Sequence, residues 1–174
     1  MQKNIVLIGF MGVGKTAVGQ ALSARLKREL VDLDGVIADS EGRPITRIFT
    51  ESGEAYFRRL EKALVKENSQ KENLIIACGG GVVLDKDNMV NLKRTGTVIY
   101  LKARPEVIFR RTKNYQHRPL LNVADPQKKI AELLVLREPF YAQADFTVDT
   151  SEKTIVQVVE EILKVIRLRP SNNK

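Results

Sequence analysis

A glycine-rich loop near the start of the chain is the first stretch that could do chemistry. Residues 9–16 read GFMGVGKT, the pattern Gly-x4-Gly-Lys-Thr. Glycines let backbone N–H groups converge on phosphates, and a helix that starts at the loop adds the positive end of its dipole. Lys15 is expected to reach the β- and γ-phosphates of a nucleoside triphosphate, most simply ATP, and Thr16 to ligate Mg²⁺. The residues expected to hold the nucleotide are Gly12, Val13, Gly14, Lys15, Thr16 and Ala17.

Two aspartates end the second apolar run, LVDLD at residues 30–34. Side chains alternate along a strand, so Asp32 and Asp34 are expected to point to the same side. Beside a phosphate loop, one carboxylate could hold Mg²⁺ and the other could orient or deprotonate an acceptor hydroxyl. The alternative is a pair of solvated aspartates, or an N-cap for the helix that follows.

An arginine and three glycines form the next candidate group. Arg58 lies early on a predicted helix, where it could point into a cleft or form a surface ion pair with Glu54 or Glu61. The glycines at 79–81 follow a predicted strand. They suit a backbone that approaches a ligand closely or offers N–H groups to an anion, and a tight turn is the alternative.

The second half of the chain adds further arginines. The basic stretch FRRTKNYQHRPLLN, residues 109–122, is typical of a mobile lid that brings arginine charge over a transferring phosphate. His117 is the only histidine in the chain, so we interpret it as a solvated lid residue and not as a metal ligand. Arg137, on a helix before the last strand, could form with Arg58 a two-arginine clamp for a carboxylate, although the sequence leaves open whether the two meet.

The elements that must position these residues alternate between strands and helices. Short apolar runs predict strands at 4–9, 30–34, 73–78, 97–101 and 146–149. Amphipathic stretches predict helices at 15–29, 54–68 and 153–168. This alternation predicts a doubly wound α/β sheet with right-handed crossovers. Ligands of such sheets bind outside the carboxyl ends of the strands, where the candidate residues fall.

Composition narrows the functional class. The 174 residues fit one α/β domain, and no apolar run approaches the ~18 residues that a membrane span needs. With one cysteine, Cys78, and no export signal, we expect a cytoplasmic protein that uses no disulfide. The net charge of +8 is spread along the chain, and no aromatic platform accompanies it, so we expect no nucleic-acid partner.

Taken together, the motifs carry a resemblance to a known family. In order they are GFMGVGKT, VDLD, GRPITRIFTESGEAYFRRLE, the triple glycine 79–81, RRT…RPLL and LREPFYAQAD. The chain resembles the shikimate kinases over essentially its whole length. The resemblance implies a P-loop NTPase of the nucleoside-monophosphate-kinase-like type, a three-layer α/β/α fold with a five-stranded parallel sheet and a lid. It implies a single kinase domain over 1–168, a substrate-binding segment at about 32–61, a lid at about 112–124 and a C-terminal tail at 169–174.

The resemblance also implies an activity and partners. Such an enzyme transfers the γ-phosphoryl group of MgATP to the 3-hydroxyl of shikimate, giving shikimate 3-phosphate and ADP, on the way to chorismate and the aromatic amino acids. Its expected partners are these small molecules, with no membrane, and a monomer is expected. One alternative is a kinase for another hydroxylated acceptor, such as gluconate or a nucleoside monophosphate. Another is a protein that binds ATP as a switch.

Carried over residue by residue, the resemblance assigns roles on the acceptor side. Asp32 supports the metal with Thr16, and Asp34 binds the acceptor hydroxyl and either deprotonates or orients it. Arg58 and Arg137 clamp the carboxylate, with a backbone contact from Gly80.

On the nucleotide side, the resemblance gives Arg118 of the lid a contact with both the substrate and the γ-phosphate. Arg111 matches the arginine that stacks on adenine, with the adjacent Arg110 left as the alternative.

Overall fold

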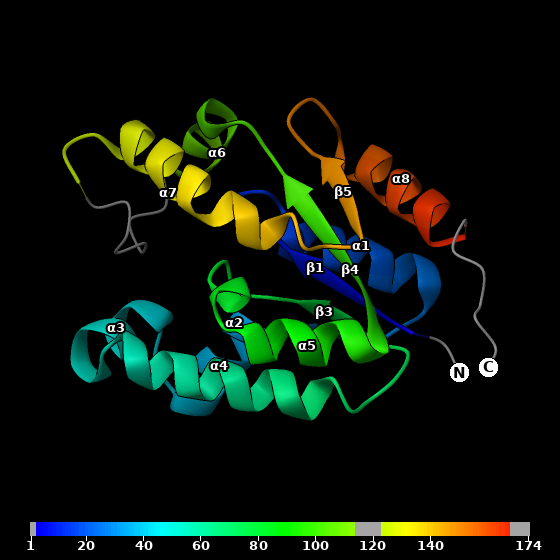
Figure 1. Ribbon diagram of the computed structural model, residues 1–174, viewed down its shortest axis with the longest axis horizontal. Helices are drawn as coiled ribbons and strands as arrows, with labels where there is room; N and C mark the ends of the chain where they lie inside the picture. The colour runs from blue at the N-terminus through cyan, green and yellow to red at the C-terminus, as the bar shows by residue number, and fades with distance from the viewer. Residues whose placement is uncertain (1–2, 114–122, 168–174) are drawn as a thin grey trace.

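The computed structural model describes residues 3–113 and 123–167, and its elements form a doubly wound α/β domain (Figure 1). The strands are β1 (Asn4–Ile8), β2 (Leu30–Asp32), β3 (Ile75–Ala77), β4 (Gly96–Lys102) and β5 (Phe146–Asp149). The helices are α1 (Lys15–Leu26), α2 (Leu33–Glu41), α3 (Ile45–Ser52), α4 (Glu54–Asn68), α5 (Lys86–Thr95), α6 (Pro105–Thr112), α7 (Pro126–Tyr141) and α8 (Ile155–Arg167), with a 3₁₀ turn, η1 (Val82–Leu84).

The five strands form one parallel sheet in the order β2-β3-β1-β4-β5, which confirms the predicted fold class. The chain passes from β1 to β2 on one side of the sheet, and from β3 across to β4 on the other. The strand order therefore reverses at β1, and the crevice outside the carboxyl ends of the strands at this point is where such sheets bind ligands.

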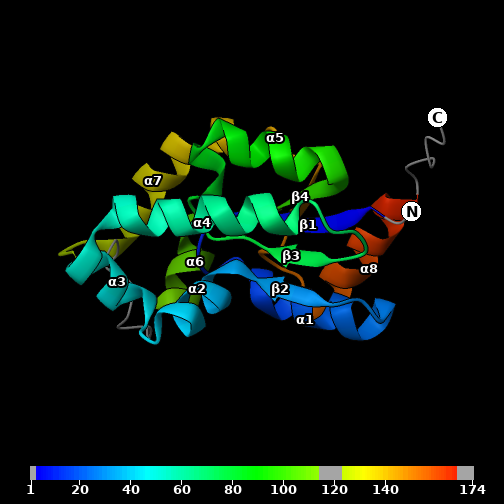
Figure 2. The same cartoon turned by 90° about the horizontal axis from the view of Figure 1, so that it is seen from below.

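The alternation of β1 side chains divides the core into two layers. Ile5 and Leu7 pack with residues of α1, α6, α7 and α8, whereas Val6 and Ile8 pack with residues of α4 and α5. Figure 2 shows these helix layers on opposite sides of the sheet. Because both faces are covered, the central strands are apolar at nearly every position, as the sequence predicted.

A third, smaller core lies beside the sheet. Ile37 of α2, Ile48 of α3 and Phe57 of α4 form it, and Phe49 packs against Phe57 with ring centroids 4.9 Å apart. Figure 1 shows α3 and the start of α4 extending beyond the sheet on the side away from the chain termini. This α2–α4 unit forms one wall of the crevice.

The predicted strand at 30–34 is two residues too long. The strand ends at Asp32, whose carboxylate accepts a hydrogen bond from the Gly35 N–H at 3.4 Å and caps α2. Aspartate is among the preferred N-caps because it satisfies N–H groups that the first helical turn leaves unpaired. Asp34 therefore lies in the first turn of a helix, and the strand-alternation argument for its direction is wrong.

Two helix ends also differ from the sequence expectation. Helix α1 ends at Leu26, with Lys27 in the left-handed region at φ 57°, three residues before the predicted end. Helix α8 begins at Ile155 because Thr154 and Gln157 form a reciprocal capping box: Gln157 N–H donates to Thr154 Oγ1 and Thr154 N–H to Gln157 Oε1. Helix α4 has the predicted bounds.

Within the described ranges, no helix is both long and apolar enough to cross a bilayer. The tail at 169–174, like most of the expected lid at 112–124, lies outside the described residues.

Asn4, at the amino end of β1, offers a test of how β3 is anchored to the sheet. It is fully buried, its Nδ2 donates to Lys71 O at 2.8 Å, and its Oδ1 accepts from Leu74 N at 2.9 Å, so one side chain fixes the start of β3 against β1. Asn4→Leu is expected to lower the free energy of unfolding by about 2 kcal/mol, because it leaves buried backbone groups unpaired. Urea denaturation measures this, with exposed Gln20→Leu as the control. Equal stability of the two variants would contradict the anchoring role.

Candidate active site

The phosphate loop connects β1 to α1 at the point where the strand order reverses. Gly14 caps α1 at φ 100°, a conformation that side-chain-bearing residues rarely adopt, and so turns the N–H groups of the first helical turn toward the crevice. Lys15 Nζ folds back over the loop and donates to Gly9 O at 2.8 Å and Phe10 O at 3.0 Å. The ammonium group thus lies at the mouth of an anion-binding loop.

Thr16 and Asp32 join this loop to the next strand. The Thr16 hydroxyl donates to Asp32 Oδ2 at 2.6 Å, so the two residues predicted to hold Mg²⁺ are in direct contact. A hydroxyl and a carboxylate are the hard oxygen donors that Mg²⁺ prefers, and this ion usually takes its other ligands from phosphates and water. In the described ranges no group of three or more His, Cys, Asp or Glu side chains could hold a metal ion.

A cavity of about 440 Å³ brings the two halves of the predicted site together. Asp34 lines it from the first turn of α2, even though the reason for expecting it there was wrong. Of the predicted loop residues, Val13 is buried behind the others and Ala17 faces the cavity. The lining residues are Met11, Gly12, Gly14, Lys15, Thr16, Ala17, Asp32, Asp34, Cys78, Gly80, Arg111 and Thr112.

Each of the three glycines at 79–81 lies close to a different part of the site. A Cβ built on Gly80 would lie 3.4 Å from Met11 N and 3.6 Å from Gly9 O, so the glycines lie beside the phosphate loop. A Cβ on Gly79 would lie 2.6 Å from Glu61 Oε1 and 2.7 Å from Asp34 Oδ1. A Cβ on Gly81 would collide with the Arg58 guanidinium. The glycines therefore leave room for charged side chains, and do more than form a tight turn.

Arg58 forms both of the ion pairs that the sequence offered as alternatives. Its Nη2 lies 3.0 Å from Glu54 Oε1, and its Nη1 lies 2.7 Å from Glu61 Oε2. Burial disfavours its charge, but the pairing with Glu61 and Glu54 outweighs burial and raises the pKa of Arg58. These ion pairs hold the guanidinium against Gly81, beside the cavity. Arg58 can therefore form ion pairs and still point into the cleft.

Glu61 is a site residue that the sequence analysis considered only as a surface partner. Its side chain is 1% exposed, and Oε1 has no hydrogen-bond partner among the residues that the structure describes. Burial raises the pKa of Glu61, the adjacent Arg58 opposes that shift, and the charge of Asp34 adds to it. Its i+3 spacing from Arg58 was visible in the sequence, but its burial depends on the distant glycines.

Arg137 reaches the same glycines from α7. It is 8% exposed, its guanidinium lies 5.5 Å from the centroid of the Phe10 ring, and Nη1 donates to Gly80 O at 3.4 Å. Tyr141, one turn further on, donates to the same carbonyl at 2.6 Å, and burial raises its pKa to about 12, so the hydroxyl keeps its proton. Arg137 and Arg58 therefore lie against neighbouring glycines, and their role as a clamp stays a prediction.

The structure distinguishes Arg111 from Arg110, the two arginines considered for the nucleotide half of the site. Arg111 lines the cavity, whereas Arg110 is exposed on α6. Burial lowers the pKa of Arg111, and the charge of Arg110 adds to that shift. Of these two arginines, Arg111 is the one that lines the cavity. Arg118, the predicted lid arginine, and His117 lie outside the described residues.

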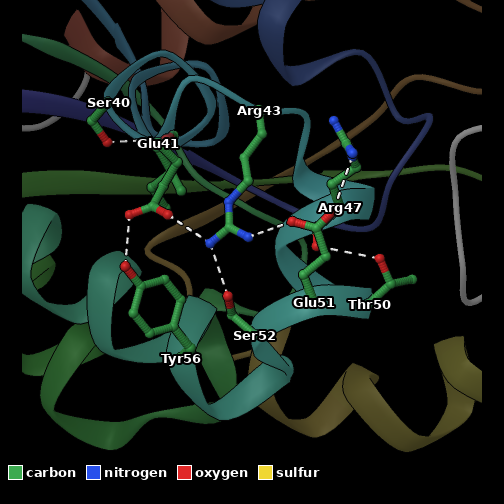
Figure 3. Close-up of polar contacts among 9 residues, drawn as sticks. Ser40, Glu41, Arg43, Arg47, Thr50, Glu51, Ser52 and Tyr56 are labelled. Carbon is green, nitrogen blue, oxygen red and sulfur yellow. Dashed lines mark hydrogen bonds and ion pairs between the residues drawn. The ribbon is translucent and has the colours of Figure 1, made fainter.

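The α2–α4 unit is tied together by a polar cluster around Arg43 (Figure 3). Arg43 Nη2 lies 2.9 Å from Glu41 Oε2 and donates to Ser52 Oγ at 2.8 Å, while Nη1 lies 2.7 Å from Glu51 Oε2. The Tyr56 hydroxyl donates to Glu41 Oε1 at 2.7 Å. The guanidinium thus joins the ends of α2 and α3, and Glu41 links them to Tyr56 at the start of α4, the helix that carries Arg58.

Cys78 lines the cavity but is 3% exposed, and burial raises the pKa of its thiol strongly. A thiol that keeps its proton is a weak nucleophile, so Cys78 acts as a packing residue.

Comparison with known proteins gives one consistent result. The family model described as shikimate kinase matches residues 11–167. The chain is 51% identical to the shikimate kinase of Caldanaerobacter subterraneus subsp. tengcongensis, covering 93% of this chain and 95% of the relative, and 47% identical to that of Thermoanaerobacter pseudethanolicus, covering 96% and 98%. The structure of shikimate kinase from Acinetobacter baumannii in complex with shikimate superposes with a TM-score of 0.94 at 35% identity, covering 99% of this chain and 97% of that one.

The raised pKa of Glu61 predicts how stability depends on pH. The folded protein holds this proton more tightly than the unfolded chain, whose carboxyl has an ordinary pKa of 4.5. The stability that Glu61 provides is therefore fully present below pH 4.5 and is lost as pH rises through the higher folded pKa.

Relative to Glu61→Gln, the wild type is expected to lose free energy of unfolding as pH rises from 4 toward 7, measured by urea denaturation. Glu67→Gln, at an exposed position of the same helix, is the control and is expected to show no such trend. A difference between wild type and Glu61→Gln that stayed constant with pH would contradict the shift.

Proposed function

The chain belongs to the shikimate kinase family, and we propose on that basis that it transfers the γ-phosphoryl group of MgATP to the 3-hydroxyl of shikimate. The products are shikimate 3-phosphate and ADP, and the reaction is a step toward chorismate and the aromatic amino acids. The observation that carries the proposal is the shared cavity, which Lys15 and Thr16 line from the donor side and Asp34 and Gly80 from the acceptor side.

On the donor side, Lys15 and the N–H groups of the loop are proposed to bind the β- and γ-phosphates. Charge of this kind, fixed before the reaction, stabilises the phosphoryl group during transfer. Thr16 and Asp32 are proposed to hold Mg²⁺, which would neutralise phosphate charge when bound. Arg111 is proposed to contact the base.

On the acceptor side, Arg58 and Arg137 are proposed to grip the carboxylate of shikimate, because two planar guanidinium groups suit bidentate contacts. This grip would place the 3-hydroxyl near Asp34. The hydroxyl oxygen forms a bond to the γ-phosphorus, the bond from that phosphorus to the β–γ bridging oxygen breaks, and ADP leaves. Asp34 is proposed to orient the hydroxyl or to accept its proton.

The remaining assignments are proposals of the same kind. A single kinase domain over 1–168, a lid at about 112–124 that brings Arg118 to the γ-phosphate, a monomeric state and a cytoplasmic location all fit an enzyme of two small anionic substrates. Their support is the resemblance of the sequence to the family.

The activity is tested by ADP release from MgATP with shikimate, gluconate, AMP or no acceptor. We expect turnover with shikimate, and little with the other acceptors or with water. A sugar-acid kinase would respond to gluconate, and an ATP switch would hydrolyse ATP slowly whatever the acceptor. No dependence of turnover on shikimate would reject the proposed function.

Asp34→Asn is expected to lower kcat by about 10²-fold, because a positioned acid–base group contributes roughly 10²–10⁴-fold to a rate. Steady-state kinetics with shikimate measure this, and circular dichroism confirms the fold. Asp39→Asn, at an exposed position of the same helix, is the control. An unchanged kcat would remove Asp34 from the mechanism.

Arg58→Ala is expected to raise KM for shikimate by about 10-fold or more with a smaller effect on KM for ATP, because a hydrogen bond to a charged group is worth about 1.5–3 kcal/mol. Arg59→Ala is the matched control, since the neighbouring Arg59 is exposed and stacks on Tyr56. A variant that lost affinity for ATP and kept its affinity for shikimate would place Arg58 in the nucleotide half of the site, contrary to the proposal.

A further inference from the structure

Thr150 is a buried residue that neither the sequence motifs nor the proposed chemistry uses. It directly follows β5 and is 2% exposed. Its N–H donates to Lys102 O at 2.8 Å, which continues the pairing of β5 with β4 by one residue. Its backbone position is therefore fixed by the sheet, and its side chain points under the phosphate loop.

The Thr150 hydroxyl connects two parts of the nucleotide half of the site. Oγ1 donates to Val13 O at 3.1 Å, in the phosphate loop, and accepts from Arg111 Nη1 at 3.1 Å. The direction of each bond is unambiguous, because a carbonyl can only accept and a guanidinium can only donate. The single hydroxyl proton goes to the loop, and an oxygen lone pair goes to the arginine.

Arg111 is held by Thr150 at two points. Besides the bond to the hydroxyl, its Nη2 donates to the Thr150 carbonyl at 2.7 Å. Two bonds from the two ends of a rigid, planar fork fix the plane of the guanidinium. The neighbouring Arg110 lies exposed on the same helix. Arg111 thus lines the cavity in an orientation set by a residue of another element.

Val13 is the loop residue between Gly12 and Gly14, both of which have positive φ angles, of 79° and 100°. Its side chain is buried and its carbonyl faces Thr150, so the hydroxyl fixes the loop from beneath. One oxygen atom therefore connects the peptide that shapes the phosphate loop to Arg111, the arginine proposed to contact the base.

We propose that Thr150 is a positioning residue for the nucleotide, whose hydroxyl sets the plane of Arg111 relative to the phosphate loop and thereby the spacing between base and phosphate contacts. The proposal rests on the proposed use of a nucleotide in this cavity. It deepens that proposal by naming a determinant of nucleotide affinity and base selectivity that does not itself touch the substrate.

The test compares Thr150→Val, which keeps the shape and removes the hydroxyl, with Thr150→Ser, which keeps the hydroxyl. Calorimetric titration with ADP, without acceptor, gives nucleotide affinity, and steady-state kinetics give KM for ATP, KM for shikimate and the ratio of kcat/KM with ATP to that with GTP. Thr147→Val makes the same change at an exposed position of β5 and is the control.

We expect Thr150→Val to raise the Kd for ADP and KM for ATP by about 10-fold and to reduce the preference for ATP over GTP, because a bond to a charged donor and a bond to the loop are both lost. KM for shikimate is expected to change by less than about 3-fold, and Thr150→Ser to restore nucleotide affinity. If Thr150→Val does not fold, Thr150→Ala also removes the hydroxyl and can be compared with Thr150→Ser in its place.

Three results would overturn the proposal: an ADP affinity of Thr150→Val equal to that of wild type, equal losses in the Val and Ser variants, or a parallel rise of both KM values together with a lower Tm. ADP binding needs no acceptor, so the experiment distinguishes failure of this proposal from failure of the proposed function. In that case the wild type would show no shikimate-dependent turnover while ADP affinity still depended on the hydroxyl.

Discussion

The parallel pairing of β1 with β3 is the constraint on which the whole site depends. Leu7 is in register with Ala77, and Cys78 N–H donates to Leu7 O at 3.0 Å, so both strands end at the same level. Each is followed by a glycine-rich stretch, and Gly80 lies against the backbone of the phosphate loop. The part of the chain that binds the donor and the part that approaches the acceptor thus meet through backbone contact, with no side chain between them.

Charge in the acceptor half is balanced locally. Arg58 lies between Glu54 and the buried Glu61, and carboxylate oxygens of Glu61 and Asp34 both border the space that a Cβ on Gly79 would occupy. A carboxylate and a guanidinium buried together cost desolvation, which their pairing only partly offsets. The arrangement therefore acts mainly to fix the position of Arg58. The net basic charge of the chain says little about this balance, which depends on individual pairs.

Features that depend on the local sequence pattern could be predicted, whereas features that depend on contacts between residues far apart in the sequence could not. Composition and spacing predicted the buried parallel strands and the loop GFMGVGKT, residue type suggested Arg137, and the family resemblance suggested Arg111. The helical position of Asp34 was missed because the capping preference of Asp32 competes with an apolar run that resembles a strand. Glu61 could not be recognised, because its burial is created by glycines 18 or more positions away. Site roles for Lys15, Asp34, Arg58 and Arg118 stay predictions.

The small core of Ile37, Ile48 and Phe57 has a consequence for how such an enzyme can diversify. Its three buried residues belong to neither of the two layers that cover the sheet, although Leu64 packs against both this core and the layer of α4 and α5. Arg43 bonds to Glu41 and Glu51 at the ends of the two helices beside it. Substitutions within this unit can reshape the pocket that receives the acceptor while leaving the sheet and phosphate loop untouched. Acceptor preference can therefore change through substitutions in this unit while the residues that contact the nucleotide stay as they are.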